Sequence, residues 1–443
     1  MTNVCANEKI IDKSLFLGFA FPADTAGREG GHGMTTLQDT PRASRLHIGL
    51  FGRRNSGKSS LMNALTGQEI AIVSARPGTT TDPVYKSMEI AGIGPVVFID
   101  TAGFDDDEAE LGAARVHQTE RAAKETDIAL VLFPPEEGGD AEALRFAAHL
   151  KEMGRPVLAV VSQADLLADG GAARAAAIGR AAQVTALAVS ARERRGLDAL
   201  RREIARLLPA DYALRSITGD LCREGDTVLL VMPQDIQAPK GRLILPQVQT
   251  LRELLDKHAL VLSCTTDKLD EALALLREPP QLIITDSQAF RTVYEKKPKE
   301  SLITSFSVLF AALKGDLSYF LAGARLLATR KGTGGSDHIL IAEACTHKPL
   351  AEDIGRVKLP RLLRRTLGGE IAVNVVSGKD FPEDLTGYDL IIHCGSCMFN
   401  RSYVLCRVAE ARAAGVPMTN YGLAIAALLG ILPDVALPER VEP

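Results

Sequence analysis

The sequence predicts an α/β protein made of three successive domains. Short apolar runs alternate with segments of helical periodicity in three separate series, and such alternation is typical of parallel sheets covered by helices. Stretches with proline and charged residues close the first two series, at 209–219 and at 295–300. The predicted units are an extension followed by three domains: 1–44, 45–212, 216–305 and 306–443.

The composition is that of an ordinary globular protein. Of the 443 residues, 46% are hydrophobic and 24% are charged, with a formal net charge of −4. A negative balance argues against a general nucleic-acid binder. No apolar run reaches the roughly 18 residues of a transmembrane helix, and the short apolar patch at 15–21 lacks the flanks of a secretory signal. We expect a cytoplasmic protein with no nucleic-acid or membrane partner.

The extension at residues 1–44 has weak periodicity and is expected to be disordered. Met34 stands shortly before the recognisable fold and is an alternative start, in which case residues 1–33 are not translated.

Apolar runs and helical periodicity place the elements of each domain. In the first domain, strands are predicted at 46–51, 96–99, 128–133, 156–161 and 186–189, with a closing helix at 197–207. In the second, strands are predicted at 227–232, 260–262 and 282–284, with helices at 249–257 and 268–276. In the third, strands are predicted at 339–341, 371–375 and 390–392, with helices at 306–314, 317–328, 351–366, 400–414 and 421–430.

The segment Gly52 to Ser60, GRRNSGKSS, matches the GxxxxGKS phosphate-binding loop between a strand and a helix. Its backbone N–H groups can surround a phosphate at the helix N-terminus. Lys58 is expected to bridge phosphate oxygens, and Ser59 to hold Mg²⁺. The residues predicted to bind nucleotide in this loop are Gly52, Asn55, Ser56, Gly57, Lys58, Ser59 and Ser60.

Two later motifs complete the Mg²⁺ and γ-phosphate site. Asp100-Thr-Ala-Gly103 follows the strand at 96–99, so Asp100 can hold Mg²⁺ through water and Gly103 can sense the γ-phosphate. Thr80, in Pro-Gly-Thr-Thr-Thr-Asp, sits where a switch threonine completes the Mg²⁺ shell once the γ-phosphate is present.

The nucleotide base is selected by two further motifs. Asp165 ends Ser162-Gln-Ala-Asp165, where guanine-specific proteins carry Asn-Lys-x-Asp. Its carboxylate can accept from N1–H and N2–H₂ of guanine, which adenine does not supply; ATP is the alternative nucleotide. Ser190 and Ala191 fit the loop that contacts the guanine O6. Because Ser162 and Gln163 replace the usual Asn and Lys, we expect guanine selectivity with weaker affinity.

Three of the seven cysteines gather near two predicted strand ends. Cys345 lies in Cys-Thr-His347 after 339–341, and Cys394 and Cys397 lie in His393-Cys-Gly-Ser-Cys after 390–392. Sites in open α/β sheets form at such strand ends. Three thiolates suit a Cys₃His zinc site or an iron–sulfur cluster with one non-cysteine position, and a redox dithiol or buried free thiols remain open. The odd number of scattered cysteines argues against a disulfide framework.

Residues 45–212 resemble the GTPases of the TrmE–Era group. The residue after Asp-Thr-Ala-Gly is Phe104, so no glutamine is available there to orient the attacking water. In that group an Asn at the position of Asn55 can help to hold a K⁺ ion that supplies positive charge in the transition state. The resemblance therefore implies slow, K⁺-stimulated hydrolysis of GTP to GDP, with Lys58, Thr80 and Asn55 as catalytic residues. Alternatively, Asn55 is a turn residue whose side chain makes its hydrogen bonds within the protein.

The combination of these GTPase motifs, a middle α/β domain and a Cys-Thr-His…His-Cys-x-x-Cys pattern resembles the [FeFe]-hydrogenase maturation GTPases, the HydF family, over residues 45–443. The resemblance implies a [4Fe–4S] cluster on Cys345, Cys394 and Cys397, and a homodimer. It also implies a scaffold that carries the diiron subcluster. The implied partners are the radical-SAM maturases that build the subcluster and the apo-hydrogenase that receives it.

The labile fourth cluster position has three candidates: His347, His393 and Glu352. Each histidine could instead hydrogen-bond around the ligands, and Glu352 could be a carboxylate at a helix N-terminus. A competing hypothesis is an Era- or TrmE-like GTPase that acts on RNA and has a structural zinc site. The negative charge and the lack of a basic GXXG segment count against it. A GTPase with an unassigned α/β partner domain and buried thiols is a third hypothesis.

Overall fold

The computed structural model of the chain describes residues 41–438, apart from gaps at 67–82, 91, 102–108, 137, 139, 210–211, 213–214, 234–242, 331, 333–336, 346–353 and 369. The predicted extension up to residue 40 lies outside the described residues. Its last part, Arg42–Ser44, forms a 3₁₀ turn, and the Arg42 guanidinium lies 3.7 Å from the centroid of the Tyr85 ring. The described part of the chain therefore includes the last residues of the predicted extension.

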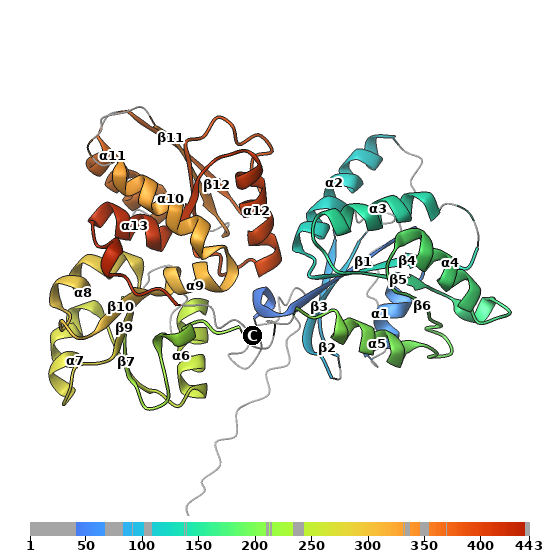
Figure 1. Cartoon of the computed structure of the whole chain (residues 1–443), viewed down its shortest axis with the longest axis horizontal. Helices are drawn as coiled ribbons and strands as arrows, with labels where there is room; N and C mark the ends of the chain where they lie inside the picture. Colours follow the sequence, from blue (N-terminus) through green and yellow to red (C-terminus); the bar gives the residue numbers. More distant parts are fainter. Residues whose placement is uncertain are drawn as a thin grey trace, which may run out of the picture. The chain divides into compact units, whose positions relative to one another are not determined.

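Three sheets follow one another along the chain, which confirms the predicted α/β class (Figure 1). The first sheet has the order β2-β3-β1-β4-β5-β6, and within it only the β2–β3 pair is antiparallel. Its strands are β1 (Leu46–Gly52), β2 (Val84–Ile90), β3 (Gly94–Asp100), β4 (Ile128–Phe133), β5 (Val157–Val161) and β6 (Ala186–Ala188). Its helices are α1 (Lys58–Thr66), α2 (Ala109–Glu125), α3 (Asp140–Glu152), α4 (Ala172–Ala182) and α5 (Leu197–Arg206).

Helices cover both faces of this first sheet because its central strands are apolar on both sides. Every residue of β1, β4 and β5 is buried. Residues of α1 and α5, such as Leu61 and Leu200, share one apolar cluster with strand residues. Residues of α2, α3 and α4 share a second cluster with the alternate strand residues. The two clusters leave the carboxyl ends of the strands available for a ligand site.

The second and third sheets are each four-stranded and parallel throughout, with the orders β10-β9-β7-β8 and β12-β11-β13-β14. The second contains β7 (Thr227–Val231), β8 (Leu260–Cys264), β9 (Leu282–Thr285) and β10 (Leu302–Ser305), with helices α6 (Leu245–Asp256), α7 (Leu269–Leu275) and α8 (Phe290–Lys296). The third contains β11 (Asp337–Glu343), β12 (Ile371–Ser377), β13 (Leu390–His393) and β14 (Met418–Asn420). Its helices are α9 (Phe306–Lys314), α10 (Leu317–Thr329), α11 (Leu359–Leu367), α12 (Arg401–Ala413) and α13 (Tyr421–Leu429).

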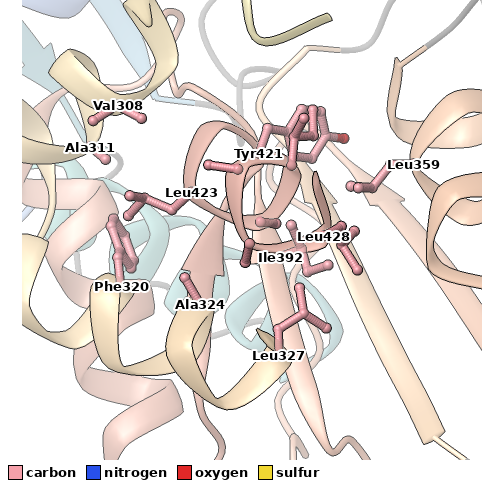
Figure 2. Packing of buried hydrophobic residues seen from close by; sticks show 14 of the residues in the cluster. Val308, Ala311, Phe320, Ala324, Leu327, Leu359, Ile392, Tyr421, Leu423 and Leu428 are labelled. Atoms are coloured by element: carbon pink, nitrogen blue, oxygen red, sulfur yellow. The ribbon is translucent and has the colours of Figure 1, made fainter. Parts of the chain in front are cut away.

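Helix α9 links the two sheets of the C-terminal half. Its residues Phe306 and Phe310 belong to a cluster with β7 and α6, whereas Val308 and Ala311 belong to the large cluster that contains α10, α13 and β13. Figure 2 shows Val308 and Ala311 near Leu423 of α13 and Phe320 of α10. The predicted boundary between residues 305 and 306 therefore falls at the start of a helix that packs against elements of both the second and the third domain.

Several elements were not predicted from the sequence. β2 lies at the edge of its sheet and exposes some of its polar residues. β10 and β14 are short strands that are rich in hydroxyl or amide side chains. These three segments form strands because they pair with β3, β9 and β13. The helix predicted at 351–366 is described from a π-helical turn at Ile354–Lys358 onward. Among the described residues, no helix is both long and apolar enough to cross a membrane.

Close packing of α10 on β14 predicts the effect of one substitution. A Cβ at Gly323 would lie 2.4 Å from the backbone oxygen of Met418. Gly323→Ala should lower the free energy of unfolding by about 1–3 kcal/mol, because overpacking outweighs the helix preference of alanine. Urea unfolding measures the change. Gly387→Ala is the control, since a Cβ there meets nothing within 4 Å. Equal stability of the two variants would contradict the packing argument.

Candidate functional site: a nucleotide pocket and a cysteine cluster

The phosphate-binding loop lies between β1 and α1, as predicted. Gly52 and Gly57 have φ of 151° and 84°, and a Cβ at Gly52 would come within 2.8 Å of the Leu132 backbone oxygen. Lys58 Nζ donates to the carbonyl oxygens of Gly52 at 2.9 Å and Arg53 at 2.8 Å. The ammonium group is thereby held over the hollow of the loop, where a phosphate binds.

The two residues predicted to hold Mg²⁺ in the loop and in the next motif lie side by side. Ser59 Oγ donates to Asp100 Oδ2 at 3.0 Å, so the helix start and the end of β3 present two oxygen ligands together. Hard oxygen ligands of this kind suit Mg²⁺. Thr80 and Gly103, predicted to complete the site, lie outside the described residues.

Gln163, Asp165 and Ala191, which lie in the motifs predicted to recognise the base, line a cavity of about 240 Å³. Asp165 Oδ1 accepts a 2.6 Å hydrogen bond from Ser190 Oγ, which fixes the carboxylate in the pocket. This bond holds the pKa of Asp165 below its ordinary value, so the side chain is an acceptor at neutral pH. The lining residues are Gly57, Ser60, Leu61, Ser162, Gln163, Asp165, Leu166, Val189, Ala191 and Arg192.

The unusual Ser162-Gln163 pair still joins the loops around the nucleotide. Gln163 Nε2 donates to the backbone oxygen of Asn55 at 3.2 Å, and Ser162 Oγ donates to the Phe133 oxygen at 3.2 Å. Asn55 and Gln163 both have positive φ, of 60° and 51°. The glutamine thus ties the base loop to the phosphate loop, a contact that the sequence pattern did not predict.

The cysteine motifs meet at one edge of the third sheet. β11 and β13 pair in parallel, with Ala342 opposite His393, so Cys345 and Cys394 follow neighbouring strand ends. The Cys394 Sγ accepts from the backbone N–H groups of Ala344 at 3.0 Å and Ser396 at 3.4 Å. N–H···S bonds of this kind stabilise metal-bound thiolates.

The three thiols differ in pKa, and therefore in how readily each one loses its proton. A hydrogen bond between Cys345 and Cys397 raises the pKa of Cys345, while the same bond and the nearby Lys314 ammonium lower the pKa of Cys397 to about 7. Burial raises the pKa of Cys394 to about 11. Cys397 is therefore the most readily ionised of the three thiols, and thiolates are the form that binds metal.

His393 is fully buried, and both of its ring nitrogens have partners. Nε2 lies 2.9 Å from Arg407 Nη1, and Nδ1 lies 2.9 Å from Ser396 Oγ and 3.0 Å from the Cys394 oxygen. Burial, followed by the Arg407 charge, lowers the pKa of His393 to about 3, so the ring is neutral. These contacts agree with the alternative role predicted for this histidine, in which it forms hydrogen bonds around the metal ligands. The other two candidates for the fourth position, His347 and Glu352, lie outside the described residues.

The donor set fits a metal–thiolate group. Three thiols, two N–H donors to sulfur and two buried cations, Lys314 and Arg407, surround the strand ends. Within the described residues no three His, Cys, Asp or Glu side chains converge as ligands of a single ion. A cluster differs from a single ion in binding its cysteines through separate iron atoms. Cys345, Cys394 and Cys397 are the residues that would hold a metal–thiolate group at these strand ends.

Two residues of this site were not predicted from the sequence. Lys314 ends a helix in which no other residue is charged, and that isolated charge is the signal that could have identified it. Arg407 is 1% exposed, and its guanidinium carbon lies 4.7 Å from the ring centroids of Phe381 and Phe399. Its surroundings come from several segments, so no local pattern marks it.

Family models match three consecutive parts of the chain. Residues 217–315 match the hydrogen maturase F dimerization domain, and residues 318–437 match the hydrogen maturase F tetramerization domain. Residues 47–163 match the 50S ribosome-binding GTPase model. The chain belongs to the HydF family of TrmE/Era-like GTPases. It is a GTPase that binds GTP, GDP and Mg²⁺, and its second and third domains are those through which the family oligomerises.

Curated relatives match a smaller part of the chain. The tRNA modification GTPase MnmE of Neisseria meningitidis is 38% identical over 162 residues, which are 36% of this chain and 34% of the relative. MnmE of Paracidovorax citrulli is 39% identical over 170 residues, 35% of this chain and 34% of the relative. The matches thus span about a third of the length of these relatives.

Solved structures of GTPases match part of the chain. Aquifex aeolicus Era bound to GDP·AlF₄⁻ is 20% identical, with a TM-score of 0.33, over 52% of this chain and 98% of the other. NFeoB of S. thermophilus bound to GDP·AlF₄⁻ and K⁺ is 25% identical, with a TM-score of 0.28, over 36% of this chain and 61% of the other.

The base pocket predicts a change of nucleotide preference. Asp165→Asn replaces one acceptor oxygen by an N–H donor, which opposes the donors of guanine but matches xanthine, whose position 2 carries a carbonyl. The variant should lose at least about tenfold in GTP affinity and bind XTP better than GTP, because unmatched donors are costly. Competition binding measures both. Asp169→Asn is the control, since Asp169 accepts from the backbone amides of Gly171 and Ala173 and is not among the residues that line the cavity. Unchanged preference in Asp165→Asn would exclude Asp165 from base recognition.

Proposed function

We propose that this GTPase is the scaffold of [FeFe]-hydrogenase maturation: it holds a [4Fe–4S] cluster and delivers a diiron subcluster to the apo-hydrogenase. The observation that carries the proposal is the set of three cysteines at adjacent strand ends, with N–H donors to sulfur and two buried cations around them. Family membership is the independent support. The proposed partners are the radical-SAM maturases and the apo-hydrogenase, and the proposed compartment is the cytoplasm.

Three cysteine ligands suit a carrier better than four. A cluster closed by four thiolates offers no exchangeable position, whereas a weakly held fourth ligand leaves one iron open to a bridging ligand of the cargo. We assign this position to one of the candidates in the 346–353 segment, His347 or Glu352. His393 instead orients the Cys394–Cys397 loop, since both of its ring nitrogens are engaged.

The nucleotide acts in this proposal as a switch rather than on the cargo. Thr80 and Gly103 are placed by their motifs to contact the γ-phosphate and Mg²⁺, so hydrolysis changes the contacts that these segments make. A difference in affinity of the partners for the GTP and GDP states would then order loading and release.

A homodimer is also proposed, and the second sheet offers a surface for it. β8 is an edge strand of its sheet, and within the described part of the chain its outer N–H and C=O groups have no neighbouring strand. Leu255, Leu260 and Leu275, on or beside this strand, are 54%, 65% and 77% exposed. Exposed leucines next to an open strand edge favour association with a second copy.

The scaffold role is tested by iron content and visible absorption after anaerobic purification. Cys345→Ser, Cys394→Ser and Cys397→Ser should each lose most of the iron, because each removes one of three strong ligands. Cys264→Ser is the control, since this thiol lies at the end of β8 in another sheet. Lys58→Ala should abolish GTP turnover and keep the iron. Zinc in place of iron, or full iron in all three cysteine variants, would defeat the scaffold hypothesis.

Potassium stimulation is the expected catalytic property of the phosphate loop. No glutamine follows Asp-Thr-Ala-Gly, so a cation near Asn55 is proposed to supply positive charge in the transition state. GTP hydrolysis should be at least about tenfold faster in KCl than in NaCl, and Asn55→Ala should remove the difference. Steady-state phosphate release at equal ionic strength measures both rates. Equal rates in the two salts would refute this role of Asn55.

A further inference from the structure

A buried ammonium group lies inside the Cys394–Cys397 loop. Lys314, at the end of α9, is 4% exposed. Its Nζ donates to the backbone oxygens of Phe399 at 2.7 Å, Ser396 at 3.0 Å and Cys397 at 3.5 Å. Three acceptors match the three N–H donors of a charged ammonium group. The side chain thus crosses from α9 to hold the backbone that carries two of the three cysteines.

The local structure alone does not account for this lysine. A lysine at a helix C-terminus ordinarily bonds the last carbonyls of its own helix or remains in water. Lys314 instead bonds a distant loop, in which Ser396 adopts the left-handed conformation with φ of 55°. A buried cation is costly unless a negative charge compensates it. Among the described residues, the ionisable groups that act on Lys314 are the thiols of Cys397 and Cys394.

We infer that Lys314 is a positioning residue for the iron–sulfur cluster: it holds the Cys394–Cys397 loop and places a fixed positive charge against the thiolates. The inference rests on the proposed cluster. A [4Fe–4S] core of charge +2 with three thiolates has a net charge of −1, and one added electron makes it −2. A fixed positive charge stabilises the more negative, reduced state, and so it raises the midpoint potential of the couple.

Lys297 provides a matched control within the same chain. Its Nζ also bonds loop carbonyl oxygens, those of Pro298 at 3.1 Å and Ser301 at 2.9 Å, after the end of α8. It therefore shares the backbone-holding role of Lys314, and its two acceptors lie outside the Cys394–Cys397 loop. Lys297→Met removes a comparable set of hydrogen bonds, and any general effect of such a loss on the fold should appear there too.

The test compares the full-length proteins Lys314→Met, Lys314→Gln, Lys314→Arg and Lys297→Met with the wild type. After iron and GTPase assays have shown that each is loaded and folded, EPR-monitored titration with dithionite gives the midpoint potential. We expect a more negative potential in both neutral Lys314 variants and values near the wild type in Lys314→Arg and Lys297→Met. Should Lys314→Met fail to fold, Lys314→Gln provides the same comparison, since its amide still reaches toward the loop.

The outcomes separate this inference from the scaffold proposal. Wild-type potentials in the neutral Lys314 variants, or an equal shift in Lys297→Met, would overturn the role of Lys314 and leave the scaffold role untouched. Loss of iron from folded neutral variants, with iron kept in Lys314→Arg, would support the positioning role. A wild-type protein without iron would overturn the scaffold proposal itself, whatever the variants do.

Discussion

Parallel pairing of strands is the constraint on which both sites depend. In a parallel sheet the carboxyl ends of neighbouring strands meet at one edge, so residues far apart in the sequence are brought together there. β1 and β3 place Ser59 and Asp100 within a hydrogen bond in this way. β11 and β13 bring Cys345 and Cys394 to neighbouring strand ends, although 48 residues lie between them in the chain. One sheet geometry thus serves two unrelated kinds of chemistry.

The two sites differ in how they deal with charge. In the nucleotide pocket, Asp165 accepts from the Ser190 hydroxyl and Lys58 donates to the Gly52 carbonyl oxygen, so neutral groups orient both charges. In the cysteine site the three cysteines are half-buried, and its two cations are fixed inside the protein by carbonyl oxygens and aromatic rings. Buried positive charges of this kind suit an anionic group that stays bound to the protein.

Much of the fold and of the nucleotide site could be predicted, because both depend on local patterns. Strong apolar runs such as 128–133 coincide with strands, and the helix predicted at 306–314 is α9. The short strands β10 and β14 could not be predicted, since their polar residues become strands only by pairing with neighbours. Gln163 was assigned to the pocket, but its bond to Asn55 depends on two loops that are 108 residues apart.

The sequence by itself determined the order of motifs, the α/β class and the residue types of both sites. Motifs such as Gly52–Ser60 and Cys394–Cys397 are short, so their chemistry can be inferred from residues that are adjacent in the sequence. Only the tertiary structure decided that His393 is enclosed by Arg407 and Ser396, and that Lys314 lies against the cysteine loop. The reason is physical: burial and the compensation of charge are properties of segments packed together, and a linear sequence does not show which segments those are.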